Sequence, residues 1–248
     1  MKNLWAASIL AVLFAGVSFA EKKEITFTAT DGFALKGTLF SAQKAGPSIL
    51  MLHQCSADRR LYDDLGMMLS TAGYHVLSFD YRGFGASKGG EYTDYASQRQ
   101  KITEKMPGDV DGALKFLSSL PNVNTTAVGV VAGSCSVNQA IKAGQRHPAI
   151  RTLVLLSGGN SVDAQGEAYI KNSPRIPIFG AASEEDTEAA ASIRKLVGLS
   201  TNKDSQLTML KDAGHAASMF EKQPDLQADI VIWFRSNLPV GGYGSLLK

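Results

Sequence analysis

Short apolar runs alternate with amphipathic segments along most of this 248-residue chain. The runs are almost continuously apolar, which is typical of strands buried on both faces of a parallel sheet. The segments between them repeat their apolar residues every three or four positions, as helices packed on such a sheet do. The pattern predicts strands over residues 48–53, 75–80, 127–132, 151–157, 176–182 and 206–210, and helices over residues 61–72, 109–120, 138–146, 188–197 and 226–237.

The N-terminal strands have a different pattern. Residues 24–30 and 33–40 predict two strands around Asp31-Gly32, a dipeptide typical of antiparallel hairpin turns. Together with the alternating strands and helices, this predicts an α/β fold: a mostly parallel central sheet with helices on both faces and an N-terminal antiparallel hairpin. No repeat or linker interrupts the pattern, so we expect one domain over residues 21–248, with residues 238–248 as a loose tail.

Residues 1–20 have the features of an export signal. Lys2 provides a positive start, residues 4–17 are nearly all apolar, and Ser18-Phe19-Ala20 places small residues at the two positions that matter for cleavage. The apolar run is shorter than the roughly 20 residues that a membrane span needs. We therefore expect a mature protein without a membrane span, in the periplasm or outside the cell.

Composition excludes some classes of protein. The chain has 25 Lys and Arg against 23 Asp and Glu, and no basic run, so we expect no nucleic-acid partner. Two cysteines are too few for a disulfide scaffold but enough for one bridge in an oxidising compartment. We expect Arg82 to brace its loop through a carboxylate and Arg59-Arg60 to begin a helix in solvent. We expect neither a metal nor an organic cofactor, and we make no prediction of the oligomeric state.

The segment around Ser134 passes from a predicted strand to a predicted helix through small side chains. Small residues two positions before and after a nucleophile permit the sharp turn known as a nucleophile elbow. Ser134 has Ala132 and Ser136 at these positions, whereas Cys135 has Val137, whose branched side chain fits poorly where backbones crowd. Ser134 is therefore the preferred nucleophile; Cys135, or a structural turn without catalysis, remains an alternative.

A serine hydroxyl needs a base to take its proton, and the base needs an acid to orient it. Downstream of Ser134, Asp186 follows one predicted strand and His215 follows the last one. The carboxyl ends of parallel strands share one edge of the sheet, so these side chains can meet there. Other carboxylates remain open as the acid, namely Glu184, Glu185 and Asp163.

From residue 31 to about residue 237 the chain resembles α/β-hydrolases, particularly the lidless dienelactone-hydrolase-like and peptidase-like esterases. Residues 79–87, Phe-Asp-Tyr-Arg-Gly-Phe-Gly-Ala-Ser, resemble the family's D-x-R-G-x-G-x-S turn, and residues 52–55, Leu-His-Gln-Cys, occupy the place of its His-Gly oxyanion loop. The resemblance implies an α/β-hydrolase fold with Ser134 as nucleophile, His215 as base and Asp186 as orienting acid. Only residues 158–175 lie where many relatives insert a lid, so we expect no large cap.

The chain departs from the family pattern at three positions where glycine is commoner: Gln54, Ala132 and Ser136. The family places one oxyanion amide after the nucleophile and a second in the loop after the third strand. Those residues here are Cys135 and Cys55, the two cysteines of the chain. Amides that point at one oxygen bring their Cα atoms close enough for a bridge, so we predict a Cys55–Cys135 disulfide; two free buried thiols are the alternative.

These features predict hydrolysis of small or short-chain carboxylic esters through an acyl-enzyme on Ser134, with a small-molecule ester as substrate. Two alternatives remain. One is a serine peptidase or acyltransferase on the same fold. The other is a catalytically idle, hydrolase-like binding protein, which the changed glycines around Ser134 would permit.

Overall fold

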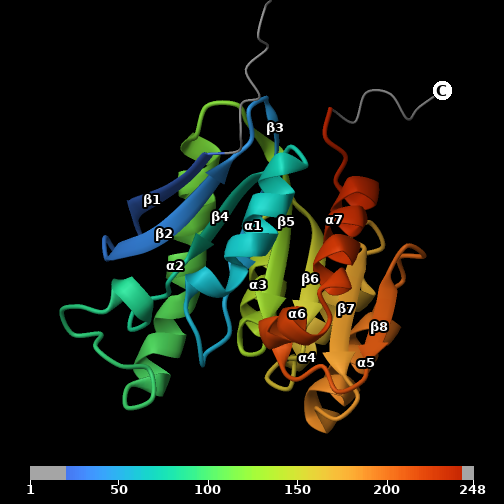
Figure 1. Ribbon diagram of the computed structural model, residues 1–248. Coiled ribbons are helices and arrows are strands. Elements are labelled where there is room, and N and C mark those ends of the chain that lie inside the picture. The colour runs from blue at the N-terminus through green and yellow to red at the C-terminus, as the bar shows by residue number, and fades with distance from the viewer. Residues whose placement is uncertain (1–20, 242–248) are drawn as a thin grey trace, which may run out of the picture.

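The computed structural model describes residues 21–241 and contains one eight-stranded sheet (Figure 1). The strands are β1 (Glu21–Thr28), β2 (Ala34–Ser41), β3 (Gly46–Leu52), β4 (His75–Phe79), β5 (Val123–Gly133), β6 (Ile150–Leu156), β7 (Ile178–Ser183) and β8 (Gln206–Leu210). Their order across the sheet is β1-β2-β4-β3-β5-β6-β7-β8. β2 pairs antiparallel with β1 and with β4, and the other neighbours are parallel. The predicted fold class and N-terminal hairpin are confirmed.

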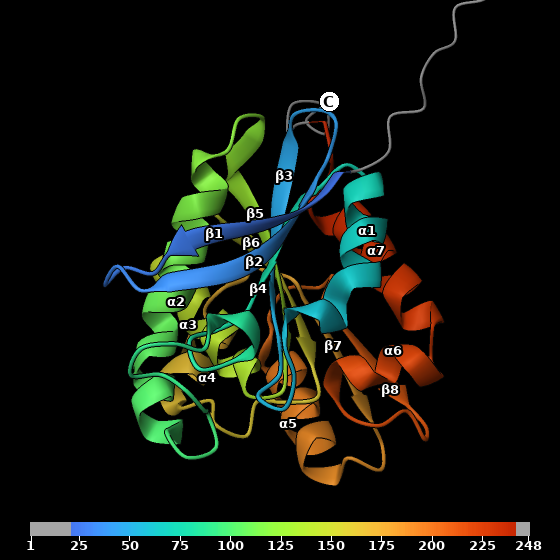
Figure 2. The same ribbon diagram turned by 60° about the vertical axis from the view of Figure 1, so that its left-hand side comes forward.

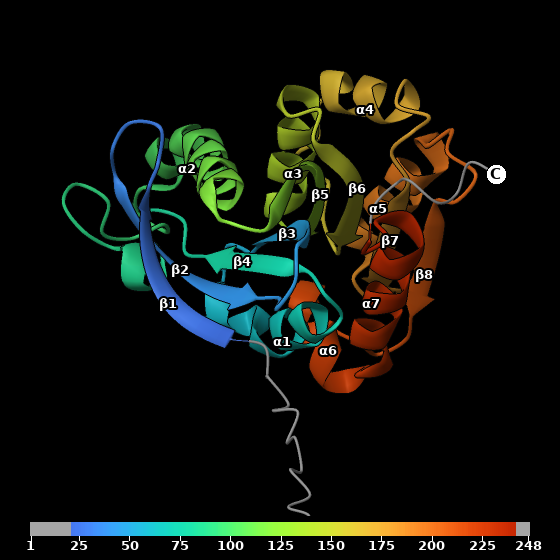
Figure 3. The same ribbon diagram turned by 90° about the horizontal axis from the view of Figure 1, so that it is seen from above.

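Helices cover both faces of the sheet, as Figure 3 shows from above. One apolar layer, in front of the sheet in Figure 1, joins it to α1 (Asp63–Thr71), α6 (Met219–Lys222) and α7 (Asp225–Asn237). The layer on the other face joins it to α2 (Arg99–Ser119), α3 (Ser136–Arg146), α4 (Ala164–Lys171) and α5 (Thr187–Leu199). No helix within residues 21–241 is long and apolar enough to cross a membrane.

The helix α2 begins at Arg99, well before the predicted start at residue 109. Pro107-Gly108 favours a break in the sequence, but the structure continues the helix through Pro107, which removes only its own N–H from the helical ladder. Buried Ile102 and Met106 hold the earlier turns of this helix against the core. Tertiary packing therefore overrides the local signal here.

The segment between β6 and β7 forms α4, which was not predicted. Only Gly166 and Ile170 of this eight-residue helix are buried. With so few core positions, the sequence shows little of the apolar periodicity that predicts a helix. It packs against α3 and α5 on the outside of the sheet, where it covers the core and does not form a cap.

The sequence predicted a loose tail that begins at residue 238. This prediction is wrong for Leu238 itself. Leu238 is fully buried, and the Tyr74 hydroxyl donates a hydrogen bond of 3.0 Å to its carbonyl. Tyr74 packs in the same core layer as α7, so the contact fixes the end of that helix. Residues 242–248 of the predicted tail, and the export signal predicted over residues 1–20, lie outside the described residues.

Arg82 fastens the N-terminal hairpin to α2. Figure 2 shows the two strands of this hairpin, β1 and β2, crossing in front of α2. The guanidinium is almost fully buried and pairs with Asp31 of the hairpin turn at 2.7 Å and with Asp109 of α2 at 2.6 Å. It also lies 4.9 Å from the ring centres of Phe33 and Tyr92. The predicted brace is confirmed: Arg82 fixes the loop after β4, which borders the edge of the sheet where Ser134 lies.

The Arg82 contact makes the contribution of Asp31 to stability depend on pH. The hydrogen bond from Arg82 lowers the pKa of Asp31 from 3.8 to about 2. A carboxylate with a lowered folded-state pKa stabilises the fold above its ordinary pKa and loses that contribution as the pH falls through its folded value. We therefore expect Asp31→Asn to lower the urea midpoint at pH 6, with a difference from wild type that shrinks between pH 4 and pH 2. A difference that grows over this interval would contradict the assignment.

Candidate active site

Ser134 lies at a sharp turn between the end of β5 and the start of α3. Its backbone has a φ of 54°, in the left-handed region that non-glycine residues rarely adopt and that costs about 1–3 kcal/mol. Its N–H donates to the Leu156 carbonyl at 2.9 Å, and its carbonyl accepts from the Val137 N–H at 3.1 Å. A Cβ at Gly158 would lie 2.3 Å from the Ser134 carbonyl oxygen, so the neighbouring loop packs directly against the turn. This is the backbone geometry expected of a nucleophile elbow.

The non-glycine residues that flank Ser134 fit the turn. Ala132 and Ser136 are both fully buried, so only small side chains are accommodated. The Ser136 hydroxyl donates a hydrogen bond of 2.6 Å to the His53 carbonyl at the end of β3. Serine at this position thus ties the turn to the neighbouring loop, which a glycine would not do.

Three side chains from separate loops form one continuous hydrogen-bonded chain. The Ser134 Oγ lies 2.8 Å from His215 Nε2, and His215 Nδ1 lies 2.6 Å from Asp186 Oδ2. An ionised carboxylate only accepts hydrogen bonds, so Nδ1 carries the proton and Nε2 is left as an acceptor for the serine hydroxyl. Ser218 holds the histidine backbone, because its hydroxyl accepts from the His215 N–H and donates to the His215 carbonyl. The arrangement can transfer a proton from Ser134 to His215.

The other carboxylates considered for the acid lie elsewhere. Glu185 accepts hydrogen bonds from the Ser183 hydroxyl at 2.6 Å and from the Asp212 N–H at 2.8 Å, and the serine contact lowers the pKa of this glutamate. Asp163 caps α4 by accepting from the Gly166 N–H at 2.9 Å. Glu184 is exposed. Of the four candidates, Asp186 is the one in contact with His215.

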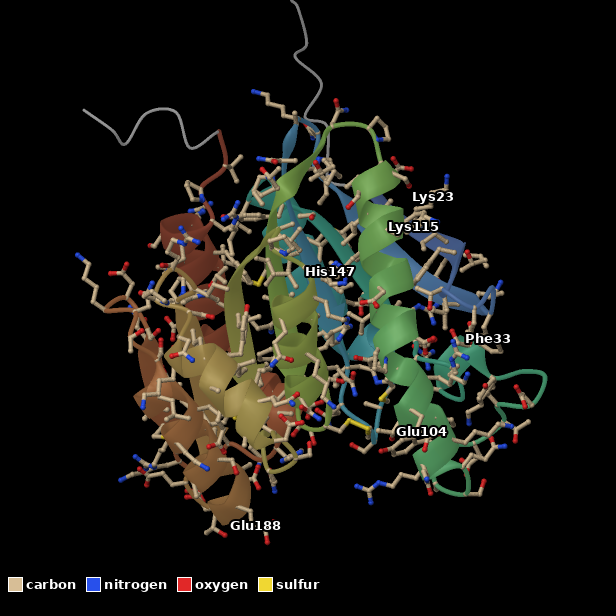
Figure 4. All side chains as sticks on the ribbon, turned by 180° about the vertical axis from the view of Figure 1, so that it is seen from behind. Lys23, Phe33, Glu104, Lys115, His147 and Glu188 are labelled. Carbon is tan, nitrogen blue, oxygen red and sulfur yellow. A yellow bond between two sulfur atoms is a disulfide. The ribbon has the colours of Figure 1, made fainter. Side chains whose placement is uncertain are left out.

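Cys55 and Cys135 are joined by a disulfide, with their Cα atoms 6.0 Å apart. The predicted bridge, drawn as a yellow bond in Figure 4, is therefore present, and Cys135 is not a free thiol beside Ser134. Neither the Cys55 nor the Cys135 amide donates a hydrogen bond to a carbonyl among residues 21–241. Both N–H groups are thus left for a ligand, as an oxyanion hole requires.

Gln54, the third departure from glycine, connects the Cys55 loop to the turn that carries His215. Its side-chain oxygen accepts from the Ala217 N–H at 3.1 Å, and its side-chain nitrogen donates to the Ser56 hydroxyl at 3.1 Å. Ala217 lies two residues beyond His215, so the contact joins the two sides of the site. This role was not predicted, because the partner is distant in sequence.

His53 also holds the loop that follows β3 and carries Cys55. The imidazole is fully buried, and this burial lowers its pKa. Neutral His53 donates from Nδ1 to the Gln54 carbonyl at 2.8 Å and accepts at Nε2 from the Tyr81 N–H at 3.3 Å. The ring therefore links the loop that follows β3 to the loop that follows β4.

The expectation that Arg59-Arg60 begins a helix in solvent is wrong for Arg59. Arg60 is exposed, but Arg59 is buried and its guanidinium pairs with Asp80 at 2.5 Å and with Glu24 of β1. Asp80 is itself fully buried and also accepts from the Arg59 and Ala86 backbone N–H groups, each at 2.8 Å. The segment that carries Cys55 is therefore held at both ends, by His53 and by Arg59.

Ser134 opens into a cleft of about 300 Å³, which we call the Ser134 cleft. Its walls come from the loops after β5, β6, β7 and β8, from the first turn of α5 and from the first residue of α2. They include Arg99, Ser134, Cys135, Ser157, Asn160, Ser161, Asp186, Glu188 and His215. The cleft is small and open on one side, and no segment of residues 21–241 forms a large cap over it. Those residues contain no group of three or more His, Cys, Asp or Glu side chains that could hold a metal ion.

Known proteins share this architecture. An esterase of Pyrococcus furiosus superposes with a TM-score of 0.69 at 18% identity, over 88% of this chain and 93% of the esterase. A dienelactone hydrolase of Anabaena variabilis superposes with a TM-score of 0.71 at 16% identity, over 89% of this chain and all of the hydrolase. The chain has the α/β-hydrolase fold.

A curated relative is more similar in sequence. The thiohydrolase aneE of Aspergillus aculeatus is 25% identical over 227 residues, which are 87% of this chain and 64% of that protein. The chain therefore spans less than two thirds of the relative's length. No protein-family model matches the chain.

The disulfide closes a loop with a sequence separation of 80 residues. We expect replacement of both cysteines by serine to lower the free energy of unfolding by about 4–5 kcal/mol, because the bridge restricts the unfolded chain. Urea unfolding of the double variant measures the loss, and wild type unfolded in dithiothreitol is the matched control. Equal midpoints for the oxidised wild type and the double variant would rule the bridge out, as would two free thiols in non-reduced peptides.

Proposed function

We propose that this protein is a serine hydrolase that cleaves small or short-chain carboxylic esters through an acyl-enzyme on Ser134. The observation that carries the proposal is the hydrogen-bonded chain from Ser134 through His215 to Asp186. The esterase and the dienelactone hydrolase that share the fold support the same class of reaction. The small Ser134 cleft, over which residues 21–241 form no large cap, favours a short acyl group.

The reaction proceeds in two halves. The Ser134 Oγ attacks the ester carbonyl carbon while His215 Nε2 takes the hydroxyl proton, and the negative oxygen accepts hydrogen bonds from the Cys55 and Cys135 amides. The intermediate collapses with loss of the alcohol, which receives the proton from His215. A water molecule then gives its proton to His215 and attacks the acyl-enzyme, releasing the acid and the free Ser134 hydroxyl. Asp186 keeps the imidazole oriented and stabilises its charged form.

A second candidate is hydrolysis of thioesters by the same residues. The similarity to a curated thiohydrolase favours it, and the acyl-enzyme would be the same, with a thiolate as leaving group. Paired measurements on phenyl acetate and S-phenyl thioacetate separate the two, since turnover of the thioester without turnover of the oxygen ester identifies this alternative.

The compartment forms part of the same proposal. The Cys55–Cys135 disulfide fits an oxidising environment, where such bridges persist. Together with the export signal expected over residues 1–20, it supports a periplasmic or secreted hydrolase.

Removal of the nucleophile provides the direct test. Ser134→Ala is expected to lower kcat for p-nitrophenyl acetate at least about a thousandfold, because no acyl-enzyme can form. Ser161→Ala is the matched control, because Ser161 lines the same cleft but lies outside the Ser134–His215–Asp186 chain. Asp186→Asn should also lower kcat strongly, and Glu184→Gln should not. Unchanged turnover in Ser134→Ala would refute the proposal.

A further inference from the structure

The segment that carries His215, residues 211–217, leaves the last strand of the sheet in an unfavourable backbone conformation. Asp212 and Ala216, one before and one after the histidine, have φ angles of 50° and 51°. This left-handed region is strained for residues other than glycine, and such residues keep it only where surrounding contacts hold the chain. The position of His215 therefore depends on the contacts that hold this segment.

Two side chains from the end of β7 hold the first half of the segment. Ser183, the last residue of β7, accepts a hydrogen bond of 3.0 Å from the Ala213 N–H. Glu185 accepts one of 2.8 Å from the Asp212 N–H. The Ser183 hydroxyl in turn donates to the same carboxylate oxygen of Glu185, Oε2, at 2.6 Å. We call these two side chains the Ser183–Glu185 clamp.

The clamp acts where the backbone pairing of β7 and β8 stops. The two strands lie side by side (Figure 1) and are paired in parallel as far as Ser183 and Leu210. The last backbone hydrogen bond between the two segments in the described chain runs from the Glu184 N–H to the Leu210 carbonyl, at 2.8 Å. Beyond this bond, side chains join the two segments, through the clamp and through the contact between Asp186 and His215.

The serine of the clamp is buried and the glutamate is exposed. Ser183 and Ala213 are both fully buried, so the Ala213 N–H would have no access to bulk solvent if the serine hydroxyl were removed. A buried N–H that loses its acceptor destabilises the segment that carries it. The hydrogen bond from Ser183 lowers the pKa of Glu185, so this exposed carboxylate stays ionised near neutral pH and only accepts hydrogen bonds.

We propose that Ser183 and Glu185 are positioning residues for the hydrolysis. Their clamp holds the segment of His215 against the segment of Asp186, which sets the 2.6 Å contact between the imidazole and the carboxylate. The inference rests on the proposed function and adds to it two residues that act through the backbone of the His215 segment. Neither residue lines the Ser134 cleft, so loss of the clamp should lower kcat and leave KM nearly unchanged.

Removal of the buried hydroxyl gives the first test. Ser183→Ala is expected to lower kcat for p-nitrophenyl acetate by about tenfold to a hundredfold, because a misplacement of about 1 Å at a reacting group can cost a hundredfold. KM should stay within about twofold, since both halves of the reaction use the same imidazole. A wild-type kcat, or a loss confined to KM, would overturn the proposal.

Thr152→Val is the matched control for stability. The Thr152 hydroxyl is also fully buried, donates to the Pro177 carbonyl at 3.0 Å and accepts from Trp233 Nε1 at 2.9 Å. It lies near the start of β6, whereas Ser134 lies at the carboxyl ends of the strands. The kcat, measured well below the melting temperature of each variant, should fall in Ser183→Ala and not in Thr152→Val. An equal fall in both would attribute the loss to stability alone and contradict the positioning role.

The exposed end of the clamp permits a conservative rescue. Glu185→Ala removes the acceptor of the Asp212 N–H and is expected to lower kcat about threefold to tenfold, with KM unchanged. Glu185→Gln keeps a side-chain oxygen that can accept, and its kcat should stay within about twofold of wild type. Glu184→Ala removes the exposed carboxylate of the preceding residue and should have no effect. If Glu185→Ala has the same kcat as Glu184→Ala or as Glu185→Gln, the proposal is wrong.

The two proposals fail in different ways. If Ser134→Ala hydrolyses p-nitrophenyl acetate as fast as wild type, the serine hydrolase proposal falls and the clamp assignment falls with it. If Ser134→Ala is inactive but Ser183→Ala and Glu185→Ala keep the wild-type kcat, only the clamp assignment falls.

Discussion

The covalent bond between Cys55 and Cys135 determines how the two sides of the candidate site are held together. It joins the loop after β3 to the turn after β5, and both residues keep a backbone N–H without a carbonyl partner in the described chain. Two amides that must meet one oxygen need a fixed separation, and a bridge between their side chains limits how far they can move apart. The disulfide thus stabilises the fold and pre-organises the proposed oxyanion hole with the same bond.

Buried polar contacts hold the parts of the site that the disulfide does not reach, namely the turn at Ser134 and the turn that carries His215. Ser134 keeps a positive φ because the Gly158 backbone and the Ser136 hydrogen bond to the His53 carbonyl, just after β3, leave the turn little freedom. On the opposite side, Gln54 connects the Cys55 loop to the turn that carries His215. Two of the three residues that stand where the family more often has glycine, Gln54 and Ser136, therefore cross-link the loops around Ser134.

The sequence predicted the parts of the site that depend on chain order. Ser134, Asp186 and His215 each follow their own strand, and parallel strands bring such positions to one edge of the sheet. The features that the sequence did not predict depend on residues that are far apart in the chain. The burial of Arg59 requires Glu24 and Asp80, and the role of Gln54 requires Ala217. The weakly apolar α4 and the continuation of α2 through Pro107 likewise follow from tertiary packing and not from local pattern.

The central claim is that this fold makes one hydroxyl, that of Ser134, an activated nucleophile. Reaction of the oxidised protein with a fluorophosphonate, followed by intact-mass measurement and peptide mapping, tests it most directly. The expected result is a single adduct on the peptide that contains Ser134, formed much more slowly when His215 is replaced by alanine. An unlabelled protein, an adduct on another residue, or equal labelling in the His215 variant would contradict the claim.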